Sequence, residues 1–367
     1  MFSRRERPDP TAAIQSRRKI VKMPSQRPAR NFRNQLATTT PIFVIVCLAT
    51  ACLATTLMQA QGVAPVNQNV NQIAILHWYP VNRIPLVLSL ANSGAGTPEM
   101  VAFDGSQMLV TTTTSTVLGC RTAGETVATA GQENCSGAAD SGSAASWLAY
   151  DGARVWTVNS ASNTVTVFPP NRYGTNTFTV GTNPQGIAFD GGNIWVANSG
   201  SNTVTKLGAY LGGLKGTFAV GTAPVGVAFD GVNIWVANSG SNNVTKLRAM
   251  DGTVMGTFSV GTTPIGVAYD GANIWVANSG SSSVTKINAS TGTVLGTFTV
   301  GAGPYALAYD GANIWVTCRS GNSVYELLAS TGAVLQTINL AGGPQGVAFD
   351  GTSIWVTIPS INSIAKF

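Results

Sequence analysis

A stretch of 24 residues, 184–207 (PQGIAFDGGNIWVANSGSNTVTKL), recurs along the chain. Close copies occupy 224–247 and 264–287, and looser copies begin at Pro304 and Pro344. The Asp-Gly pairs of these copies stand 40 residues apart, at Asp190, Asp230, Asp270, Asp310 and Asp350. Weaker copies at Asp104 and Asp151 bring the total to seven. A fixed period of this length indicates a solenoid or a propeller, because one unit cannot bury its apolar surface alone.

Each unit contains four short apolar runs separated by turn signals. In the first complete unit the runs are 186–189, 194–197, 203–207 and 215–220. Asp190-Gly191 and the Asn/Ser/Gly cluster 198–202 are typical of tight turns between strands. No run has the length or the period of a helix. We therefore predict an all-β fold, a seven-bladed β-propeller of four-stranded blades over residues 84–367.

The last copy ends at Phe367, after its third run, so its blade lacks a fourth strand. A spare strand, 86–90, precedes the first copy. We expect this N-terminal strand to complete the last blade, because closure removes exposed sheet edges.

Three residue types recur within the repeats. The tryptophans of the second run are expected to pack between blades, and a ligand platform is the alternative; they are Trp156, Trp195, Trp235, Trp275, Trp315 and Trp355. The repeated Asp residues suit tight hairpins, with a cation-binding ring as the alternative. Lys206, Lys246 and Lys286 in the third run predict a solvated outer face.

The segments Trp195-Val196-Ala197-Asn198, Trp156-Thr157-Val158-Asn159 and Trp315-Val316-Thr317 resemble the Tyr-Val-Thr-Asn strand of YVTN-type propeller repeats. The units also resemble NHL-type and WD40-like repeats and the streptogramin (virginiamycin B) lyase-like propellers. The resemblance covers about 84–367 and implies the propeller fold, which hosts both binding and catalysis. In the lyase-like family, activity is expected to need His and Glu residues with a divalent metal. No repeat contains His, and Glu326 is the only Glu from Tyr150 onward, which argues against an enzyme.

Residues 1–40 form a basic tail. It carries ten Lys and Arg residues against two acids, a net charge of +8, whereas the whole chain is +6. The rest of the chain is therefore about −2, so nucleic-acid binding by the propeller is not expected. We interpret the tail as a disordered cytoplasmic segment.

The uncharged segment 41–58 lies within a predicted signal peptide or membrane anchor, 41–60. The preceding positive charge predicts a cytoplasmic tail and an exported propeller. The segment could be retained as an anchor, cleaved to give a secreted or periplasmic protein, or lipidated at Cys52, and Met23 could be the true start. A polar linker, 61–83, follows and holds His77, the only histidine, which is expected to be a surface or packing residue.

Cys120 and Cys135 lie in the one enlarged repeat, where successive Asp-Gly pairs are 47 residues apart. In an exported domain, two cysteines with this spacing predict a disulfide across the enlarged loop. Metal binding is the alternative, although two thiols alone make a poor site. Cys318 is left over and is expected to be free.

The candidate ligand site is the channel mouth formed by the Pro-containing loops and the Asn/Ser/Gly turns. Its side chains are neutral hydrogen-bonding groups with one cation: Gln185, Tyr305, Arg319, Gln345, Asn198, Asn238 and Asn278. The asparagines could instead build the turns. The mouth shows no general base, nucleophile pair, metal cluster or cofactor motif. We expect a binding module for a protein, glycan or small molecule, with a lyase-like enzyme and a structural envelope component as alternatives.

Overall fold

The computed structural model describes residues 86–90, 96–114, 116–121, 135–140, 145–168, 175–210 and 212–367. The chain divides into two units, Met1–Gln68 and Asn69–Phe367, and every described residue lies in the second. The basic tail, the apolar segment 41–58 and His77 fall outside the described residues. Within the described ranges, no helix is both long and apolar enough to cross a membrane.

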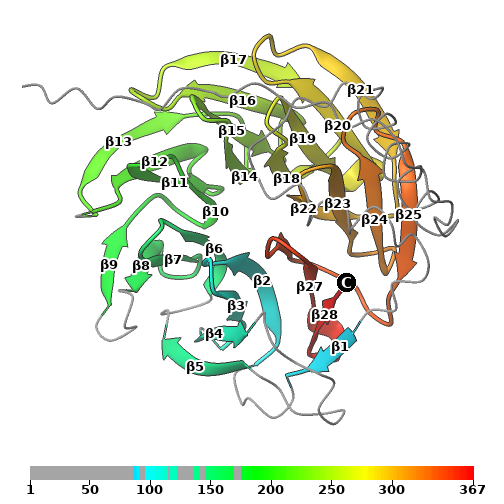
Figure 1. Ribbon diagram of the computed structural model, residues 1–367. Helices are drawn as coiled ribbons and strands as arrows, with labels where there is room; N and C mark the ends of the chain where they lie inside the picture. The colour runs from blue at the N-terminus through cyan, green and yellow to red at the C-terminus, as the bar shows by residue number, and fades with distance from the viewer. Residues whose placement is uncertain are drawn as a thin grey trace, which may run out of the picture. The chain divides into compact units, whose positions relative to one another are not determined.

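Seven antiparallel sheets of four strands each form blades 1 to 7 around a central axis (Figure 1), as the repeats predict. The strands of blades 1 to 3 are β2 (Pro98–Phe103), β3 (Gln107–Thr112), β4 (Thr116–Arg121), β5 (Cys135–Asp140), β6 (Ala145–Tyr150), β7 (Val155–Asn159), β8 (Thr164–Phe168), β9 (Asn176–Thr179), β10 (Pro184–Phe189), β11 (Asn193–Asn198), β12 (Thr203–Gly208) and β13 (Leu214–Ala219). Those of blades 4 and 5 are β14 (Pro224–Phe229), β15 (Asn233–Asn238), β16 (Asn243–Arg248), β17 (Val254–Ser259), β18 (Pro264–Tyr269), β19 (Asn273–Asn278), β20 (Ser283–Asn288) and β21 (Val294–Thr299).

Blades 6 and 7 complete the ring. Their strands are β22 (Pro304–Tyr309), β23 (Asn313–Cys318), β24 (Ser323–Leu328), β25 (Val334–Asn339), β26 (Val347–Phe349), β27 (Ile354–Ile358), β28 (Ser363–Lys366) and β1 (Leu86–Ser89). Two short 3-10 helices, Ser279–Ser281 and Pro359–Ile361, lie in turns.

The N-terminal strand closes the ring, as the sequence predicts. Blade 7 has the order β1-β28-β27-β26, and β1 pairs antiparallel with the last strand of the chain, Leu86 opposite Lys366 and Ser89 opposite Ser363. Figure 1 shows β1 beside β28, close to the C-terminus. Residues from opposite ends of the described part of the chain thus share one sheet.

The first strands of the blades contact one another in a closed ring around the central channel. The Pro-x-Gly pattern follows from this close approach. A Cβ on Gly186 would lie 2.0 Å from the carbonyl oxygen of Val225 in the next blade, and one on Gly226 would lie 2.1 Å from that of Ile265. Side chains therefore do not fit there, because backbone atoms of the neighbouring blade fill the space.

Each repeated tryptophan packs between blades. Trp156 lies in a core cluster with Ile187 and Val196 of the following blade. Its indole N–H donates to Asp151 Oδ2 at 2.9 Å, and Trp195 donates to Asp190 Oδ2 at 2.7 Å. The same Asp residues accept backbone N–H groups of their own hairpins through Oδ1. The repeated Asp residues from Asp151 to Asp350 therefore cap their turns and also hold the tryptophans.

The prediction that Lys206, Lys246 and Lys286 form a solvated outer face is wrong. They are only 6–8% exposed. The Lys246 ammonium lies 5.1 Å from the Trp235 ring centroid and donates to the carbonyl oxygen of Ala289 in the next blade at 2.7 Å. Lys206 and Lys286 make equivalent contacts. A long side chain can reach across the gap between blades, so the repeated lysine joins neighbouring blades.

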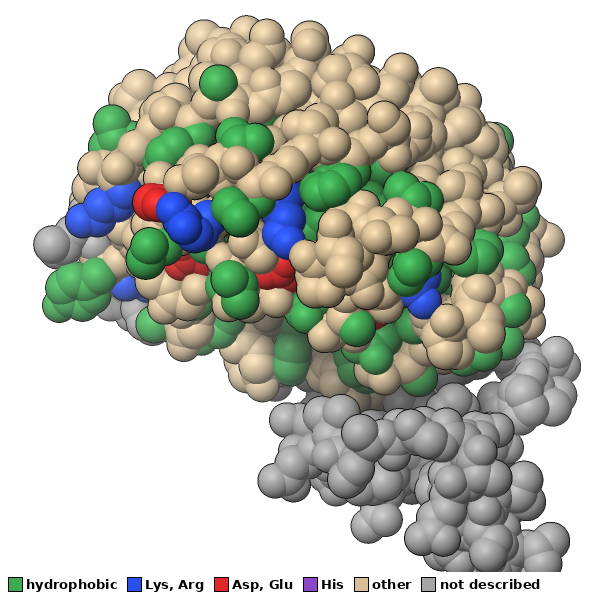
Figure 2. Space-filling view, turned by 90° about the horizontal axis from the view of Figure 1, so that it is seen from above, with side chains coloured by type: hydrophobic (Ala, Val, Ile, Leu, Met, Phe, Trp, Pro, Cys, Tyr) green, Lys and Arg blue, Asp and Glu red, His purple; other side chains and the backbone are tan. Residues whose placement is uncertain are grey.

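The outer strands expose part of their apolar side chains. Figure 2 shows such side chains standing singly or in small groups among polar ones on one outer face. Leu214 is 65% exposed and Met255 53% exposed. In blade 1 the outer strand β5 is tied to β4 by a disulfide between Cys120 and Cys135, which face each other in the strand register. Cys318 is a free, buried cysteine.

Candidate functional site

One face of the propeller carries both the Pro-containing loops and the turns between second and third strands. These loops are joined by backbone hydrogen bonds, for example from Ser199 N to Asn183 O at 3.0 Å and from Gly200 N to Thr182 O at 2.9 Å. The side chain of Asn202, at φ 56°, accepts from Ala223 N in the loop that leads to the next blade at 2.9 Å. The loops and turns of the mouth are therefore bonded to one another rather than independent.

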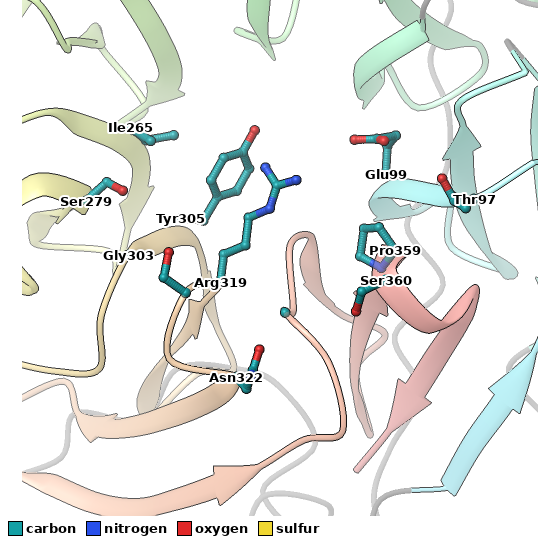
Figure 3. Close-up of a pocket in the computed structure, with 12 residues that line it drawn as sticks. Thr97, Glu99, Ile265, Ser279, Gly303, Tyr305, Arg319, Asn322, Pro359 and Ser360 are labelled. Carbon is teal, nitrogen blue, oxygen red and sulfur yellow. The ribbon is translucent and has the colours of Figure 1, made fainter.

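A hollow of about 800 Å³ opens on this face between blades 5, 6, 7 and 1 (Figure 3). This volume lies within the range of small-molecule sites, roughly 300–1,000 Å³. The hollow is lined by Thr97, Glu99, Ile265, Ser279, Gly303, Tyr305, Arg319, Ser320, Asn322, Gly343, Pro359 and Ser360. It contains one carboxylate and one guanidinium, and the rest of the lining is neutral.

Arg319 and Tyr305 form one side of the hollow. The Arg319 guanidinium lies 5.7 Å from the Tyr305 ring centroid, and the Trp147 ring of blade 2 stacks on Tyr305 with centroids 6.3 Å apart. Blades 2 and 6 are not neighbours, so the Trp147 contact spans the channel. The Tyr305 ring thus has two partners, and its hydroxyl points into the opening (Figure 3). Burial raises the pKa of Tyr305, Arg319 opposes this, and Glu99 adds to it.

Glu99 lies on the other side of the hollow (Figure 3). It follows the first residue of β2, the position that Tyr305 has in β22. Its carboxylate accepts a hydrogen bond from Gln345 Nε2, and Gln345 is only 3% exposed. Gln345 therefore acts from within the protein, holding Glu99 at the surface of the hollow.

Threonine hydroxyl groups fix the backbone of these residues. Thr357 Oγ1 accepts from Gly346 N at 2.7 Å and donates to Glu99 O at 2.6 Å. Thr317 Oγ1 donates to Gln345 O at 2.7 Å in the same way. In blades 3 to 5 the matching residue is Ala, for example Ala277, which cannot make these bonds. The polar arc of the mouth thus has supports that the regular blades lack.

A second, smaller cavity of about 130 Å³ lies deeper in the channel. Met100 and Val101, which follow Glu99, line it together with Ala306 and Leu307, which follow Tyr305. Trp147 also lines it. The channel is thus polar at the mouth and apolar below.

The candidate residues named from the sequence occupy four different settings. Tyr305 and Arg319 line the hollow, and Gln345 supports Glu99 from behind. Gln185, in blade 3, is absent from this hollow and donates to Asn183 at 2.9 Å.

The three asparagines are fully buried. Asn198 donates to Thr203 and Thr205 Oγ1 at 3.1 and 2.9 Å, and it accepts from Gly181 N at 3.1 Å. Asn238 and Asn278 likewise donate to side chains of their third strands. These side chains build the turns, so they are not part of the candidate site.

Glu99 is the residue that the sequence reading missed. The signal was present, because Pro98-Glu99 aligns with Pro304-Tyr305 and Pro344-Gln345. Blade 1 is the most divergent copy, which concealed the match.

The described residues contain no group of three or more His, Cys, Asp or Glu side chains that could hold a metal ion. Burial raises the pKa of the Cys318 thiol to about 12, which leaves it a poor nucleophile at neutral pH. Glu99, Arg319 and Tyr305 supply hydrogen-bonding and charged groups to the mouth.

Solved structures with the same propeller fold match this chain. A streptogramin B lyase structure matches with a TM-score of 0.63 and 16% identity, over 77% of this chain and 96% of that one. The chain has the fold of a streptogramin lyase-like propeller. Kuenenia stuttgartiensis hydrazine synthase also matches, with a TM-score of 0.63 and 18% identity, over 74% of this chain and 96% of that one. No protein-family model and no curated protein matches the sequence. These likenesses establish the fold alone, because one propeller fold hosts many functions.

Proposed function

We propose that the protein is a binding module that holds a small polar molecule in the hollow between blades 5, 6, 7 and 1. The observation that carries this proposal is the convergence of Arg319, Tyr305 and Glu99 on one hollow of about 800 Å³. All three stand at positions where the regular blades carry different residues: Ser199, Ser239 and Ser279 match Arg319, while Gln185, Val225 and Ile265 match Tyr305 and Glu99.

The hollow favours a small molecule over a protein partner, because its charged groups lie within a concave site. The Tyr305 ring contacts Arg319 and Trp147 in the free protein, so little conformational entropy is lost when a ligand binds beside it. Arg319 supplies a planar set of donors suited to a carboxylate or phosphate. An enzyme remains the alternative function, and in that case Glu99 is the one carboxylate in the hollow available as an acid or base.

We further propose that the propeller acts outside the cytoplasm. The basic tail and the apolar segment 41–58 support export. The Cys120–Cys135 disulfide adds support, because disulfides persist in oxidising compartments. Protease added to intact cells should remove an epitope tag at Phe367 and spare one at the N-terminus; protection of the C-terminal tag until the cells are lysed would contradict export.

The test of the binding site is a screen of the full chain against small polar fragments, read by saturation-transfer NMR. Fragments that bind the natural sequence should bind Tyr305→Ala and Arg319→Ala more weakly by about 1–3 kcal/mol. Lys215→Ala, on the exposed outer strand β13, is the matched charge control and should bind as before. Fragments that bind all three variants equally would place the site elsewhere.

A further inference from the structure

We infer that the ligand is a zwitterion, with its anionic group on Arg319 and its cationic group on Glu99. This inference rests on the proposed function and names the class of molecule that the hollow takes. It comes from two opposite charges that face each other across the hollow without forming an ion pair.

The Glu99 carboxylate keeps most of its acceptor capacity. An ionised carboxylate offers about four lone-pair positions, and the Gln345 amide N–H occupies one of them. Gln345 is neutral, so it orients Glu99 without cancelling its charge. Within the described residues, no Lys or Arg side chain forms an ion pair with Glu99. A cationic group of a ligand would therefore meet a fixed, uncompensated carboxylate.

Arg319 is similarly placed but not neutralised. Its backbone N–H donates to Gly303 O at 2.9 Å, and its guanidinium rests on the Tyr305 ring. In the part of the chain that the structure describes, the guanidinium makes no hydrogen bond or ion pair. A guanidinium has five N–H donors in a planar fork that matches a carboxylate. The cation–π contact with Tyr305 orients this fork while leaving its donors available.

The two groups stand on opposite sides of the opening (Figure 3). They come from different blades, and each is anchored by its own neutral partner, Gln345 for Glu99 and Tyr305 for Arg319. A ligand with one charge would pair with one group and leave the other partly desolvated without a partner, which is costly. A zwitterion can place its anionic group on Arg319 and its cationic group on Glu99 at the same time. Its electrostatic energy of binding is therefore more favourable than that of a ligand with one charge.

The apolar residues of the lining guide the choice of a zwitterionic probe. Ile265 and Pro359 add apolar surface beside the two charges. An α-amino acid with a branched apolar side chain presents all three features, so L-leucine is a suitable probe. 4-Methylpentanoate lacks its ammonium group, and 3-methylbutylamine lacks its carboxylate.

Isothermal titration calorimetry on the full chain tests the inference. L-Leucine should bind at least about tenfold more tightly than either analogue. Glu99→Gln should weaken L-leucine about tenfold and leave 4-methylpentanoate unchanged, whereas Arg319→Gln should weaken L-leucine and leave 3-methylbutylamine unchanged. Gln185→Ala, at the same strand position in blade 3, is the control and should bind L-leucine normally.

Equal binding of L-leucine and 4-methylpentanoate, insensitive to Glu99→Gln, would show an anion site and overturn the zwitterion inference. Failure of all three probes to bind at millimolar concentration would also overturn it. Neither result would contradict the proposed function. That proposal fails only if fragments bind the Tyr305→Ala and Arg319→Ala variants as tightly as the natural sequence.

Discussion

Blades 3 to 5 and the arc of blades 6, 7 and 1 share one architecture but use their mouth positions differently. In blades 3 to 5 the residue after the loop proline is Gln185, Val225 or Ile265, and the strand behind it carries Ala. In the arc the same positions hold Tyr305, Gln345 and Glu99, with Thr317, Thr357 and Thr111 behind them. Packing residues such as Trp275 and Trp315 are the same in both regions.

This contrast separates two kinds of constraint. A buried tryptophan or an inner-ring glycine is set by neighbouring atoms within van der Waals distance, so every blade needs it. The mouth positions are not fixed by this packing, and they differ between blades. The differences in the arc come with matched supports, the threonine hydroxyl groups and the Gln345 amide, and this pairing supports the proposed binding site.

The largest expected loss of stability comes from a substitution in the regular blades. Trp235→Ala removes a fully buried ring and its hydrogen bond to Asp230, and it leaves Lys246 without its aromatic partner. The free energy of unfolding should fall by about 3–5 kcal/mol, measured by urea denaturation of the full chain. If the mouth variant Arg319→Ala lost as much stability, the division between packing and binding residues would be wrong.

A smaller effect is expected from Lys246→Ala. The buried ammonium donates to Ala289 O, so its loss leaves that carbonyl oxygen without this partner. Stability should fall by about 2 kcal/mol. The matched control, Lys215→Ala on the exposed strand β13, should stay within about 0.5 kcal/mol. Similar losses of stability for the two variants would mean that the contact of Lys246 with the next blade does not stabilise the protein.

The smallest effect on stability, with the sharpest effect on binding, is expected from Thr357→Val. Valine has the shape of threonine but leaves Gly346 N and Glu99 O without the hydroxyl partner. The cost in stability should be about 1–2 kcal/mol. Thr245→Val, a buried threonine in blade 4, is the control. Fragment binding should weaken in Thr357→Val alone; equal weakening in both would make Thr357 a purely structural residue.

The fold was largely predictable from the sequence because each of its determinants repeats. The 40-residue period, the Asp-Gly pairs and the missing last strand predicted seven blades and closure by residues 86–90. The structure confirms both, with β1 paired to β28. Repetition makes a local pattern reliable, since a turn that recurs seven times is not an accident of composition.

The site was only partly predictable, because side-chain direction depends on neighbouring blades. Tyr305 and Arg319 were predicted from their departure from the repeat, and both line the hollow. Lys206 was predicted to be exposed, but its long side chain reaches across to the carbonyl oxygen of Ala249 in the next blade. Its position in the strand does not reveal this direction. Asn198 was considered as a ligand residue because its turn lies at the mouth, although its side chain points into the protein. The role of Gln345 depends on Glu99, about 250 residues away, and no spacing rule connects them.

The most direct test of a ligand site in the arc is a crystallographic fragment screen of the full chain. Small polar fragments should give density in the hollow between Arg319 and Glu99, with contacts to Tyr305. Crystals of the Arg319→Ala protein should lose that density while the propeller remains unchanged. Fragments that bind only at the Asp-Gly face or along the outer strands, with none in the hollow, would contradict the account.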